Sequence, residues 1–466
     1  MNPALAHARV LRVLGALAAV AAVWLCPEPA AARDWPVPSA VATITAALER
    51  ARDGDRIVIA SGTYRERIVV ERRVTLVGAE GGAPPVIDGG GEGRVIELRA
   101  PGSAVERLQI QNSGDVVEHS DACVFVATSA EGASVRGNML RDCAFGIWVH
   151  GTERVTLEGN WISGRIKKFD SDKGNGINLW QVSRGLVRGN AIERVRDGIA
   201  LSVTTGSRLE FNRMRDLRFG IHYMYSDRNT VQNNVTCDSI VGMALMYSRR
   251  LDIRGNVMLR NRDQGVMLRS ILDSSITANR AEGNGKGLML NETAFSTVQG
   301  NWIARNDVGV HVTGGNEDVG VTGNAFVRNV TQIVYGMTQP VLWDDGEQGN
   351  HWSDYLGWDL DRDGRGDRPH QATGTMDRLL FRFPGLKVLA ASPVMLMMQW
   401  VEAKFPVVRP ASVIDRHPTM RPTPLPDPMV ELAPALADAT RGTPADQPGF
   451  CLRATDPVAA RMRRTP

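Results

Sequence analysis

Residues Asn190 to Asn212 read NAIERVRDGIALSVTTGSRLEFN, and this unit returns with small changes along the middle of the chain. Its most regular mark is an asparagine, usually preceded by glycine, which recurs every 22 or 23 residues apart from one step of 30. A fixed period of this length predicts a solenoid in which each repeat forms one coil. The repeated asparagines are Asn138, Asn160, Asn190, Asn212, Asn234, Asn256, Asn279, Asn301 and Asn324.

A second mark is a glycine followed by alternating apolar residues, and in all but two coils it falls eight residues after the asparagine. These marker glycines are Gly146, Gly176, Gly198, Gly220, Gly242, Gly265, Gly287 and Gly309. Each coil reads as short apolar alternations, such as GIAL and SRLEF, without the leucine pattern and helical back of leucine-rich repeats. Three short strands per coil predict an all-β parallel β-helix, and parallel crossovers favour right-handed winding.

The repeated asparagines, which we call the asparagine column, have a structural explanation that requires no catalytic role. Asparagine tolerates left-handed turn geometry, and its side-chain amide can hydrogen-bond the matching amide one coil away. We therefore predict a structural role for these residues and no catalytic one.

The strands that follow the marker glycines predict an inner and an outer face. The first and third residues should point to one side and the second and fourth to the other. The first and third are consistently apolar, so they are predicted to fill the core, while the second and fourth stack outward at about 4.8 Å per coil. On five adjoining coils the outward positions gather His222, Met224, Met246, Met267, Met289 and His311.

These six outward residues form a candidate copper patch. Thioether sulfur and imidazole nitrogen are ligands suited to Cu(I). Methionine also makes an adaptable apolar surface for a protein partner. The two interpretations are compatible, because a protein that passes on copper must contact its recipient. The sequence leaves both open, together with a chance gathering of these residues.

An enzymatic role is the alternative from a different class. Many exported β-helix proteins are carbohydrate-active lyases, hydrolases or epimerases, which need clustered outward carboxylates or a basic side chain. Asp197, Asp263 and Asp307 precede marker glycines and are expected in turns. Because no outward pair of carboxylates emerges from the pattern, we predict that the protein is not an enzyme.

Composition and the N-terminus indicate an exported protein. Of the 466 residues 43% are hydrophobic, and a net charge of +3 gives no basis for binding nucleic acid. Two arginines precede an apolar run from Val13 to Leu25, which is too short to span a bilayer. The small residues Ala30 and Ala32 then form a cleavage signal, so residues 1–32 are predicted to be a signal peptide.

Four cysteines follow the predicted signal peptide, namely Cys123, Cys143, Cys237 and Cys451. Export permits disulfides, and Cys123 and Cys143 are separated by nearly one repeat. Spacing alone does not establish a bond, so cysteines buried as small hydrophobic residues remain the alternative.

The repeat pattern ends near residue 340, which predicts a β-helix over residues 33–340 and a C-terminal extension over 341–422. The extension contains the opening of a calcium loop, in which alternate carboxylates converge on one cation and Gly364 permits the turn. The acidic residues are Asp359, Asp361, Asp363 and, at the ninth position, Asp367. The twelfth position holds His370 instead of the glutamate of an EF-hand. We predict a structural calcium-like site, with an acidic turn held by neighbouring arginines as the alternative.

Residues 392–405 read SPVMLMMQWVEAKF and predict a short helix, with Ser392 as its cap and Pro393 in its first turn. Such a helix can close the end of the solenoid or dock against a membrane transporter, and both roles stay open. The proline- and alanine-rich residues 423–466 are predicted to be a disordered tail.

The exported coils, the segment GNHWSDYLGWDLDRDGRGDRP and the segment SPVMLMMQWVEAKFPVVRPASVIDRHPTMRP together resemble the NosD family, the periplasmic maturation proteins of nitrous oxide reductase. The resemblance covers almost the whole mature chain, to about Pro422, and the two segments carry it more specifically than the coils.

The resemblance implies a non-enzymatic role in denitrification. Proteins of this family work with an ABC-type ATPase and membrane permease pair and with a copper chaperone, and they support assembly of the copper–sulfide centre of nitrous oxide reductase. Contact with the membrane is then expected only through the permease. The family supplies no ligand set to carry over, and whether its cargo is copper or sulfur is left open.

Overall fold

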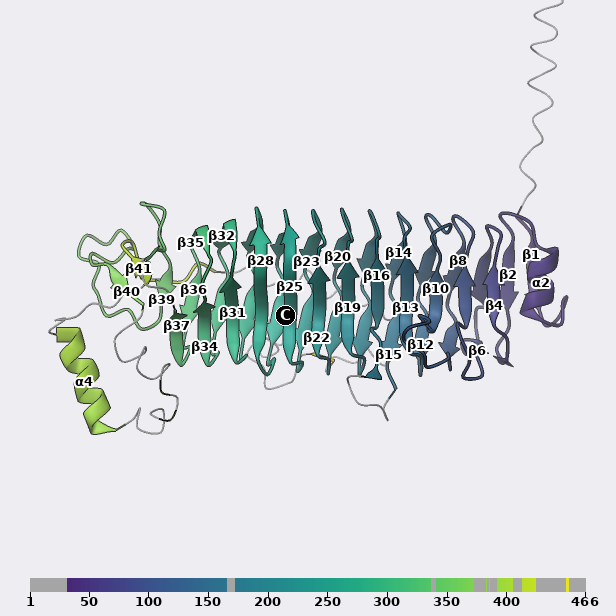
Figure 1. Cartoon of the computed structure of the whole chain (residues 1–466), viewed down its shortest axis with the longest axis horizontal. Coiled ribbons are helices and arrows are strands. Elements are labelled where there is room, and N and C mark those ends of the chain that lie inside the picture. The colour runs from purple at the N-terminus through teal and green to yellow at the C-terminus, as the bar shows by residue number, and fades with distance from the viewer. Residues whose placement is uncertain are drawn as a thin grey trace, which may run out of the picture.

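The computed structural model describes residues 32–165, 172–336, 341–372, 392–404, 413–424 and 450–451, together with Phe383 and Gly385. They form an elongated parallel β-solenoid, with the N-terminal coils at one end and the C-terminal extension at the other (Figure 1). The predicted signal peptide lies outside the described residues, apart from Ala32. The all-β solenoid predicted from the repeat is confirmed.

Each coil contributes one strand to each of three parallel stacks, which we call the first, second and third sheets. The first sheet contains the strands at the marker glycines, from β13 to β34, and the strands that continue this stack at either end. They are β4 (Ile68–Val70), β7 (Ile96–Leu98), β10 (Ala122–Val126), β13 (Phe145–His150), β16 (Ile177–Trp180), β19 (Asp197–Ser202), β22 (Phe219–Met224), β25 (Val241–Arg249), β28 (Gln264–Leu272), β31 (Lys286–Asn291), β34 (Val308–Val312) and β37 (Thr331–Tyr335).

The second sheet contains β1 (Asp34–Val37), β2 (Arg56–Ile59), β5 (Thr75–Gly78), β8 (Ala104–Glu106), β11 (Ser134–Arg136), β14 (Thr156–Glu158), β17 (Leu186–Arg188), β20 (Arg208–Glu210), β23 (Thr230–Gln232), β26 (Asp252–Arg254), β29 (Ser275–Thr277), β32 (Ala294–Gln299) and β35 (Glu317–Thr322). Hydrogen bonds join it to the first sheet, for example where Leu272 of β28 pairs with Ala294 of β32.

The third sheet contains β3 (Thr63–Tyr64), β6 (Val86–Asp88), β9 (Gln109–Gln111), β12 (Met139–Arg141), β15 (Trp161–Ser163), β18 (Ala191–Glu193), β21 (Arg213–Arg215), β24 (Val235–Cys237), β27 (Val257–Leu259), β30 (Arg280–Glu282), β33 (Trp302–Ala304), β36 (Ala325–Val327) and β39 (His351–Trp352). It therefore continues past residue 340, where the repeat pattern in the sequence fades.

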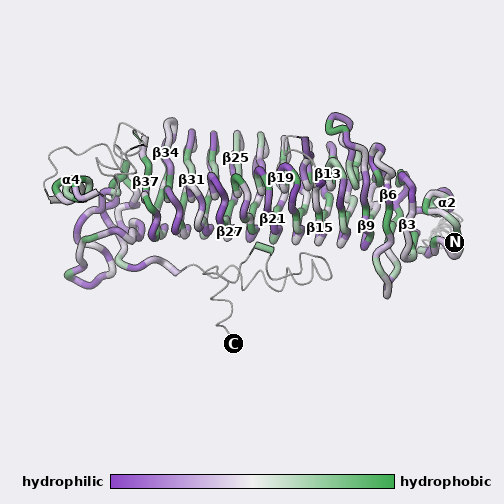
Figure 2. The backbone as a smooth tube through the Cα atoms, turned by 90° about the horizontal axis from the view of Figure 1, so that it is seen from below, coloured by the Kyte–Doolittle hydropathy of each residue, from purple (hydrophilic) through white to green (hydrophobic). Residues whose placement is uncertain are grey.

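The core lies between the three sheets. In the first sheet Ile221 and Tyr223 pair with Met243 and Leu245 of the next coil, and all four side chains are fully buried. Hydrophobic and hydrophilic stretches consequently alternate along every coil (Figure 2). The repeated asparagines form a column, and each of them directly precedes a strand of the third sheet. Its side chains are buried and hydrogen-bonded from one coil to the next.

Different structures close the two ends of the core. At the N-terminal end helix α2 (Ile44–Arg50) is capped by the Thr43 side chain and buries Ile44 and Ala47. At the other end Trp343 and Trp352 stack on Phe326, with ring centroids of Trp352 and Phe326 4.3 Å apart. Beside them lies a small sheet of β38 (Val341–Leu342), β41 (Val413–Asp415) and β40 (His370–Gln371).

Helix α4 (Pro393–Lys404) forms where a helix is predicted, and the Ser392 hydroxyl accepts a hydrogen bond from the Met395 backbone. Met395 is buried, but Leu396, Met397 and Trp400 are more than half exposed. The tryptophan stack, and not α4, therefore covers the end of the core. No helix in the described part of the chain combines the length and apolar character needed to cross a bilayer.

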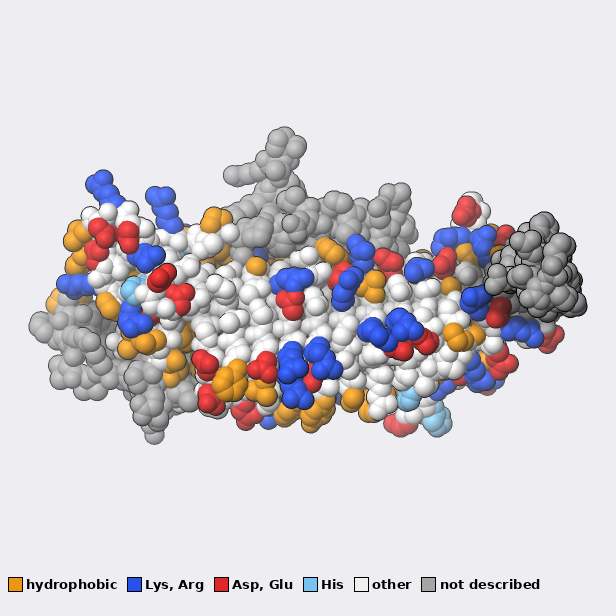
Figure 3. Space-filling model, turned by 90° about the horizontal axis from the view of Figure 1, so that it is seen from above, with side chains coloured by type: hydrophobic (Ala, Val, Ile, Leu, Met, Phe, Trp, Pro, Cys, Tyr) orange, Lys and Arg blue, Asp and Glu red, His pale blue; other side chains and the backbone are white. Residues whose placement is uncertain are grey.

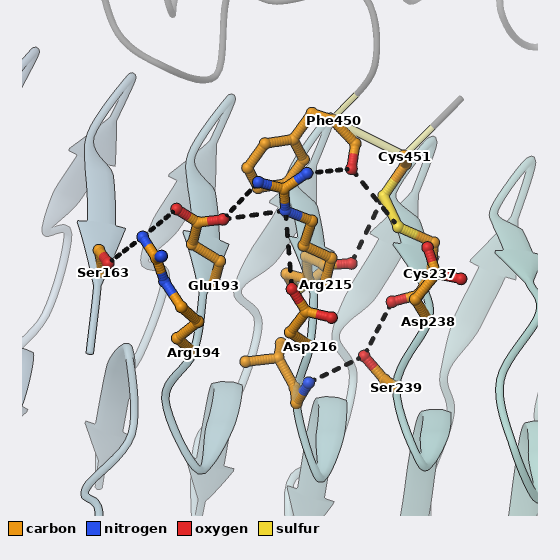
Figure 4. A network of polar contacts seen from close by, with 12 residues as sticks. Ser163, Glu193, Arg194, Arg215, Asp216, Cys237, Asp238, Ser239, Phe450 and Cys451 are labelled. Atoms are coloured by element: carbon orange, nitrogen blue, oxygen red, sulfur yellow. Dashed lines mark hydrogen bonds and ion pairs between the residues drawn. A yellow bond between two sulfur atoms is a disulfide. The ribbon is translucent and has the colours of Figure 1, made fainter. Parts of the chain in front are cut away.

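All four cysteines that follow the predicted signal peptide are paired. Cys123 bonds Cys143, and Cys237 bonds Cys451. The first bond settles a question that spacing left open. The second joins Cys451, which lies beside Phe450 in one apolar cluster, to the third sheet (Figure 4). Apart from residues 423–424 and 450–451, the segment predicted to be a disordered tail lies outside the described residues.

Candidate metal centre

The methionine and histidine residues occupy two columns on the outer face of the first sheet. Parallel register aligns His222, Ala244, Met267, Met289 and His311 on five successive strands. Two residues further along, Met224 of β22 pairs with Met246 of β25, and the column continues with Arg269 and Asn291. The six candidate ligands are half-buried, whereas Ala244 between them is fully buried.

This register divides the six residues into two groups. Neighbouring strands are about 4.8 Å apart, and outward residues on one strand are about 7 Å apart. His222, Met224 and Met246 lie on two adjoining strands and form what we call the N-terminal half-site. Met267, Met289 and His311 lie on the next three strands and form the C-terminal half-site. Ala244 and Arg269 separate them, so the six side chains do not converge on one point.

His222 is held by a carboxylate from the preceding coil. Its Nδ1 lies 3.0 Å from Oδ2 of Asp197, and Arg218 donates two further hydrogen bonds to the same carboxylate at 2.8 and 2.6 Å. Burial disfavours the charged form of Asp197, but the hydrogen bonds from His222 and Arg218 outweigh it and lower the pKa of this carboxyl. Asp197 is therefore an anion, and its carboxylate accepts a hydrogen bond from Nδ1–H of His222.

The other ring nitrogen of His222 has no partner. Nε2 is buried and makes no hydrogen bond to the described residues. In a neutral imidazole whose Nδ1 donates to a carboxylate, Nε2 carries the lone pair, and this arrangement orients metal-binding histidines. Buried polar atoms normally find partners, so an orphaned Nε2 on the same sheet face as two thioethers fits a soft cation.

The C-terminal half-site is more constrained. The Gln264 side-chain amide donates a hydrogen bond to Sδ of Met289 at 3.2 Å, so this sulfur is already engaged. Burial lowers the pKa of His311, nearby Lys286 adds to the effect, and Asp263 opposes it. Lys286 itself pairs with Asp263 at 2.6 Å. His311 is therefore neutral near pH 7, which is the form that binds metals.

Sequence reasoning missed the residues that support these ligands. Asp197 begins strand β19 and is 2% exposed, whereas the pattern placed it in a turn. Gln264 occupies the matching position of β28, directly before a marker glycine. The register partners of these two residues are apolar, namely Phe219 for Asp197 and Val241 for Gln264. A polar residue next to an apolar register partner is the signal that could have identified Asp197 and Gln264.

An aromatic pair borders the N-terminal half-site. Tyr225 and Tyr247 directly follow Met224 and Met246, and their rings stack at 5.2 Å with Tyr225 59% exposed. The Arg269 guanidinium lies 5.7 Å from the Tyr247 ring centre. Stacked tyrosines with an adjacent cation are typical of protein interfaces, so this rim agrees with a partner surface beside the ligands.

The acidic loop lies in the C-terminal extension, away from the first sheet. Ligand atoms of Asp359, Asp361 and Asp363 lie within 4.8 Å of one another. Asp359 already accepts hydrogen bonds from the backbone of Asp363 and Gly364 at 3.1 and 3.0 Å. Asp367 is not part of this group, and it accepts from the Leu360 backbone instead. Three of the four predicted ligands are therefore brought together.

Carboxylates also line a shallow hollow of about 360 Å³ at a corner of the solenoid. Glu131 and Glu153 both face Arg154 there, and Glu153 also pairs with Arg184. Since arginines compensate both charges, this hollow does not present the free acid and base that glycoside chemistry requires.

The chain matches known proteins over most of its length. A family model described as "Periplasmic copper-binding protein (NosD)" matches residues 162–357, which include both half-sites. A protein of Pseudomonas aeruginosa, described as "Probable ABC transporter binding protein NosD", is 38% identical over 384 residues, covering 79% of this chain and 89% of that protein. A protein of Stutzerimonas stutzeri with the same description is 35% identical, covering 79% and 88%. Both relatives are named as binding proteins and not as enzymes.

Solved structures share the solenoid at low sequence identity. The catalytic unit of a GH87 α-1,3-glucanase from Streptomyces thermodiastaticus superposes with a TM-score of 0.52 at 17% identity, covering 66% of each chain. The A-module of the mannuronan C-5 epimerase AlgE6 from Azotobacter vinelandii gives 0.51 at 14% identity, covering 63% of this chain and 90% of the module. These likenesses concern the fold alone.

Proposed function

The chain belongs to the NosD family of periplasmic proteins, and from this premise we propose that it is the accessory subunit of an ABC-type complex that receives or passes on Cu(I). The proposed destination is the copper centre of nitrous oxide reductase during its maturation. The observation that carries the proposal is the N-terminal half-site, where the orphaned Nε2 of His222 lies on the same face as the thioethers of Met224 and Met246.

The ligand chemistry favours Cu(I) over harder cations. Two thioethers and one imidazole carry no negative charge, and such soft donors bind Cu(I) better than they bind Mg²⁺ or Ca²⁺. Asp197 lies behind His222 and orients the ring through Nδ1, so its carboxylate is an outer-shell partner and not a ligand.

An open, half-buried site suits transfer better than storage. The three donors lie on one flat strand face, so a bound ion stays accessible from the solvent side to a ligand of a donor or acceptor protein. The C-terminal half-site offers a second position on the same face. It should bind more weakly, because Gln264 already engages the sulfur of Met289.

Anaerobic Cu(I) titration of the mature protein against a competing chelator tests the proposal. Replacing Met224, Met246, Met267 and Met289 together by leucine keeps the face apolar and removes the sulfur atoms. We expect affinity to fall by more than about 100-fold, since losing outer-shell partners alone costs 10- to 100-fold. Met420→Leu, an exposed methionine outside the first sheet, is the matched control and should bind as the wild type does.

Two double variants separate the half-sites. Met224→Leu with Met246→Leu should abolish the tighter site, while Met267→Leu with Met289→Leu should leave it intact. If the quadruple variant binds Cu(I) like the wild type, the copper proposal is wrong and the face is a docking surface. Purification of the variants with the ATPase and permease pair, and loading by the copper chaperone, then tests that second role.

A further inference from the structure

The two half-sites are supported in the same way from the preceding coil. In each of them a polar residue directly before a marker glycine contacts a candidate ligand 25 residues further along the chain. Asp197 contacts His222 at 3.0 Å, and Gln264 contacts Met289 at 3.2 Å. The two supporting residues therefore occupy equivalent positions relative to the ligands that they contact.

The two contacts differ in what they leave for a metal ion. His222 has two ring nitrogens, so Asp197 can hold Nδ1 while Nε2 keeps no partner among the described residues. A thioether has only one polar atom, its sulfur. The Gln264 amide donates its hydrogen bond to that atom of Met289. A cation bound at this sulfur would face the positive end of the amide dipole, so loading requires the NH₂ group to turn away.

The oxygen of the same amide lacks a partner. Gln264 is 6% exposed, and its Oε1 is buried and accepts no hydrogen bond from the described residues. Buried carbonyl oxygens normally lie beside a donor or a cation, because burial without such a partner is costly. Oε1 is therefore an unused donor atom beside the C-terminal half-site.

A half-turn of the amide exchanges its oxygen and its nitrogen. The terminal torsion of glutamine is broad and roughly two-fold, so both orientations are accessible. The turn withdraws the NH₂ group from the sulfur of Met289 and brings Oε1 to the side that faces it. We propose that Gln264 makes this turn when copper binds the C-terminal half-site, and that Oε1 then coordinates the ion beside the three ligands already described. The inference rests on the proposed function, because it takes copper to be the ion that reaches this face.

The oxygen donor changes which oxidation state the half-site holds. Thioethers select Cu(I), whereas nitrogen and oxygen donors suit Cu(II). Gln264 and His311 supply one oxygen and one nitrogen beside two sulfurs, and burial lowers the pKa of His311, which keeps its ring neutral. At the N-terminal half-site the corresponding oxygen donor, the Asp197 carboxylate, is already engaged by His222 and Arg218. The C-terminal half-site is therefore assigned Cu(II) as well as Cu(I), and the N-terminal half-site Cu(I) alone.

Electron paramagnetic resonance tests this assignment, because Cu(II) gives a signal and Cu(I) does not. The mature protein is titrated with Cu(II) in a glycine buffer, which removes copper held only by scattered histidines or by the amino terminus. We expect a Cu(II) signal that survives the glycine and shows coupling to an imidazole nitrogen. The coupling should disappear in His311→Gln.

Substitutions of Gln264 separate its role as a ligand from its contact with Met289. Gln264→Leu should weaken Cu(II) binding by more than about tenfold, since losing an outer-shell partner alone costs roughly 10- to 100-fold. Gln264→Glu keeps an oxygen at this place and should retain the Cu(II) signal. Met224→Leu with Met246→Leu is the matched control and should leave the signal unchanged. In that background Gln264→Leu should not weaken Cu(I) binding, because it frees the sulfur of Met289.

The outcomes distinguish this inference from the proposed function. If the wild type shows no Cu(II) signal in glycine, or if Gln264→Leu retains the signal, Gln264 is not a ligand and the inference is wrong. Loss of Cu(II) and Cu(I) together in Gln264→Leu would also overturn it, since the residue would then only support the fold of the half-site. A wild type that binds no Cu(I) at either half-site contradicts the proposed function instead, whatever the response of Cu(II) to Gln264.

Discussion

At the scale of single residues, the asparagine column holds successive coils in register. The amide of Asn234 donates to Asn256 and to the Leu209 carbonyl, and its oxygen accepts from the backbone and side chain of Asn212. Beyond Asn324 the column continues to Asn350. A second, shorter column of Asn261, Asn284, Asn306 and Asn329 runs parallel to it and escaped the repeat analysis.

Asn234→Ala should destabilise the protein by roughly 3 kcal/mol, because it leaves several fully buried polar groups without partners. The measurement is chemical denaturation followed by circular dichroism. Gln299→Ala is the control, since its side chain is exposed on β32 and should change stability little. Equal losses in the two variants would contradict a special role for the column.

A buried aspartate ends the asparagine column. The Asp415 carboxylate accepts hydrogen bonds from the Asn350 backbone and from the Trp352 indole, both at 2.7 Å. Burial raises the pKa of Asp415 above its ordinary value, although these donors act in the opposite direction. Its proton is thus bound more tightly in the folded than in the unfolded protein.

The raised pKa of Asp415 makes stability depend on pH. A folded state that binds the proton more tightly gains stability at low pH, and this contribution is lost as pH rises from about 4 through the folded pKa. Asp415→Asn removes the titration. The unfolding free energy of the wild type minus that of the variant should therefore fall as pH increases. If the unfolding free energy of the wild type minus that of the variant rose with pH, the folded pKa of Asp415 would instead be lowered.

At the scale of elements, the acidic loop is a short turn whose carboxylates cap its own backbone. The three clustered aspartates are mostly exposed, and Arg365 lies 4.0 Å from Asp363. Like charges at this distance repel one another unless a cation or an arginine compensates them. Calcium binding remains our proposal for this loop, and the acidic turn held by arginines remains its alternative.

Addition of Ca²⁺ should raise the melting temperature if the loop binds this ion, because a ligand that binds only the folded state stabilises it. Asp359→Asn with Asp361→Asn should remove the effect, whereas Asp367→Asn should retain most of it, since Asp367 lies outside the cluster. Calorimetry with Ca²⁺ and Mg²⁺ provides the measurement. A melting temperature that does not respond to Ca²⁺ favours the acidic turn.

At the scale of the whole molecule, the solenoid is a closed rod with mixed surface charge. Lysines and arginines lie beside aspartates and glutamates over the face shown in Figure 3 and do not form a single-sign field. Both ends are covered, so the unpaired edges of the terminal coils are protected from association.

Truncation after residue 336 removes the tryptophan stack and exposes the core beside Phe326. We expect this protein to lose its monomeric, soluble fraction, because uncapped solenoids associate through their open ends. Truncation after Pro424 is the matched control, since it keeps the small sheet of β38, β40 and β41. Size-exclusion chromatography compares the two, and a monomeric shorter protein would show that the cap is dispensable.

The sequence by itself determined the solenoid, its period and the residues that share a face. The reason is that strand alternation and a fixed coil length are local properties, repeated often enough to be read without the fold. The same periodicity placed His222, Met224 and Met246 in two outward columns. It could not show that the six candidate ligands divide into two groups.

Only the tertiary structure decided which residues support that face and how the tail is attached. Asp197 meets His222, and Cys451 meets Cys237, because winding brings together positions 25 and 214 residues apart. No local pattern encodes such pairs. Each pair depends on how many coils separate the two residues and on whether their side chains point to the same face of the solenoid. Contacts of this kind are a property of the complete rod.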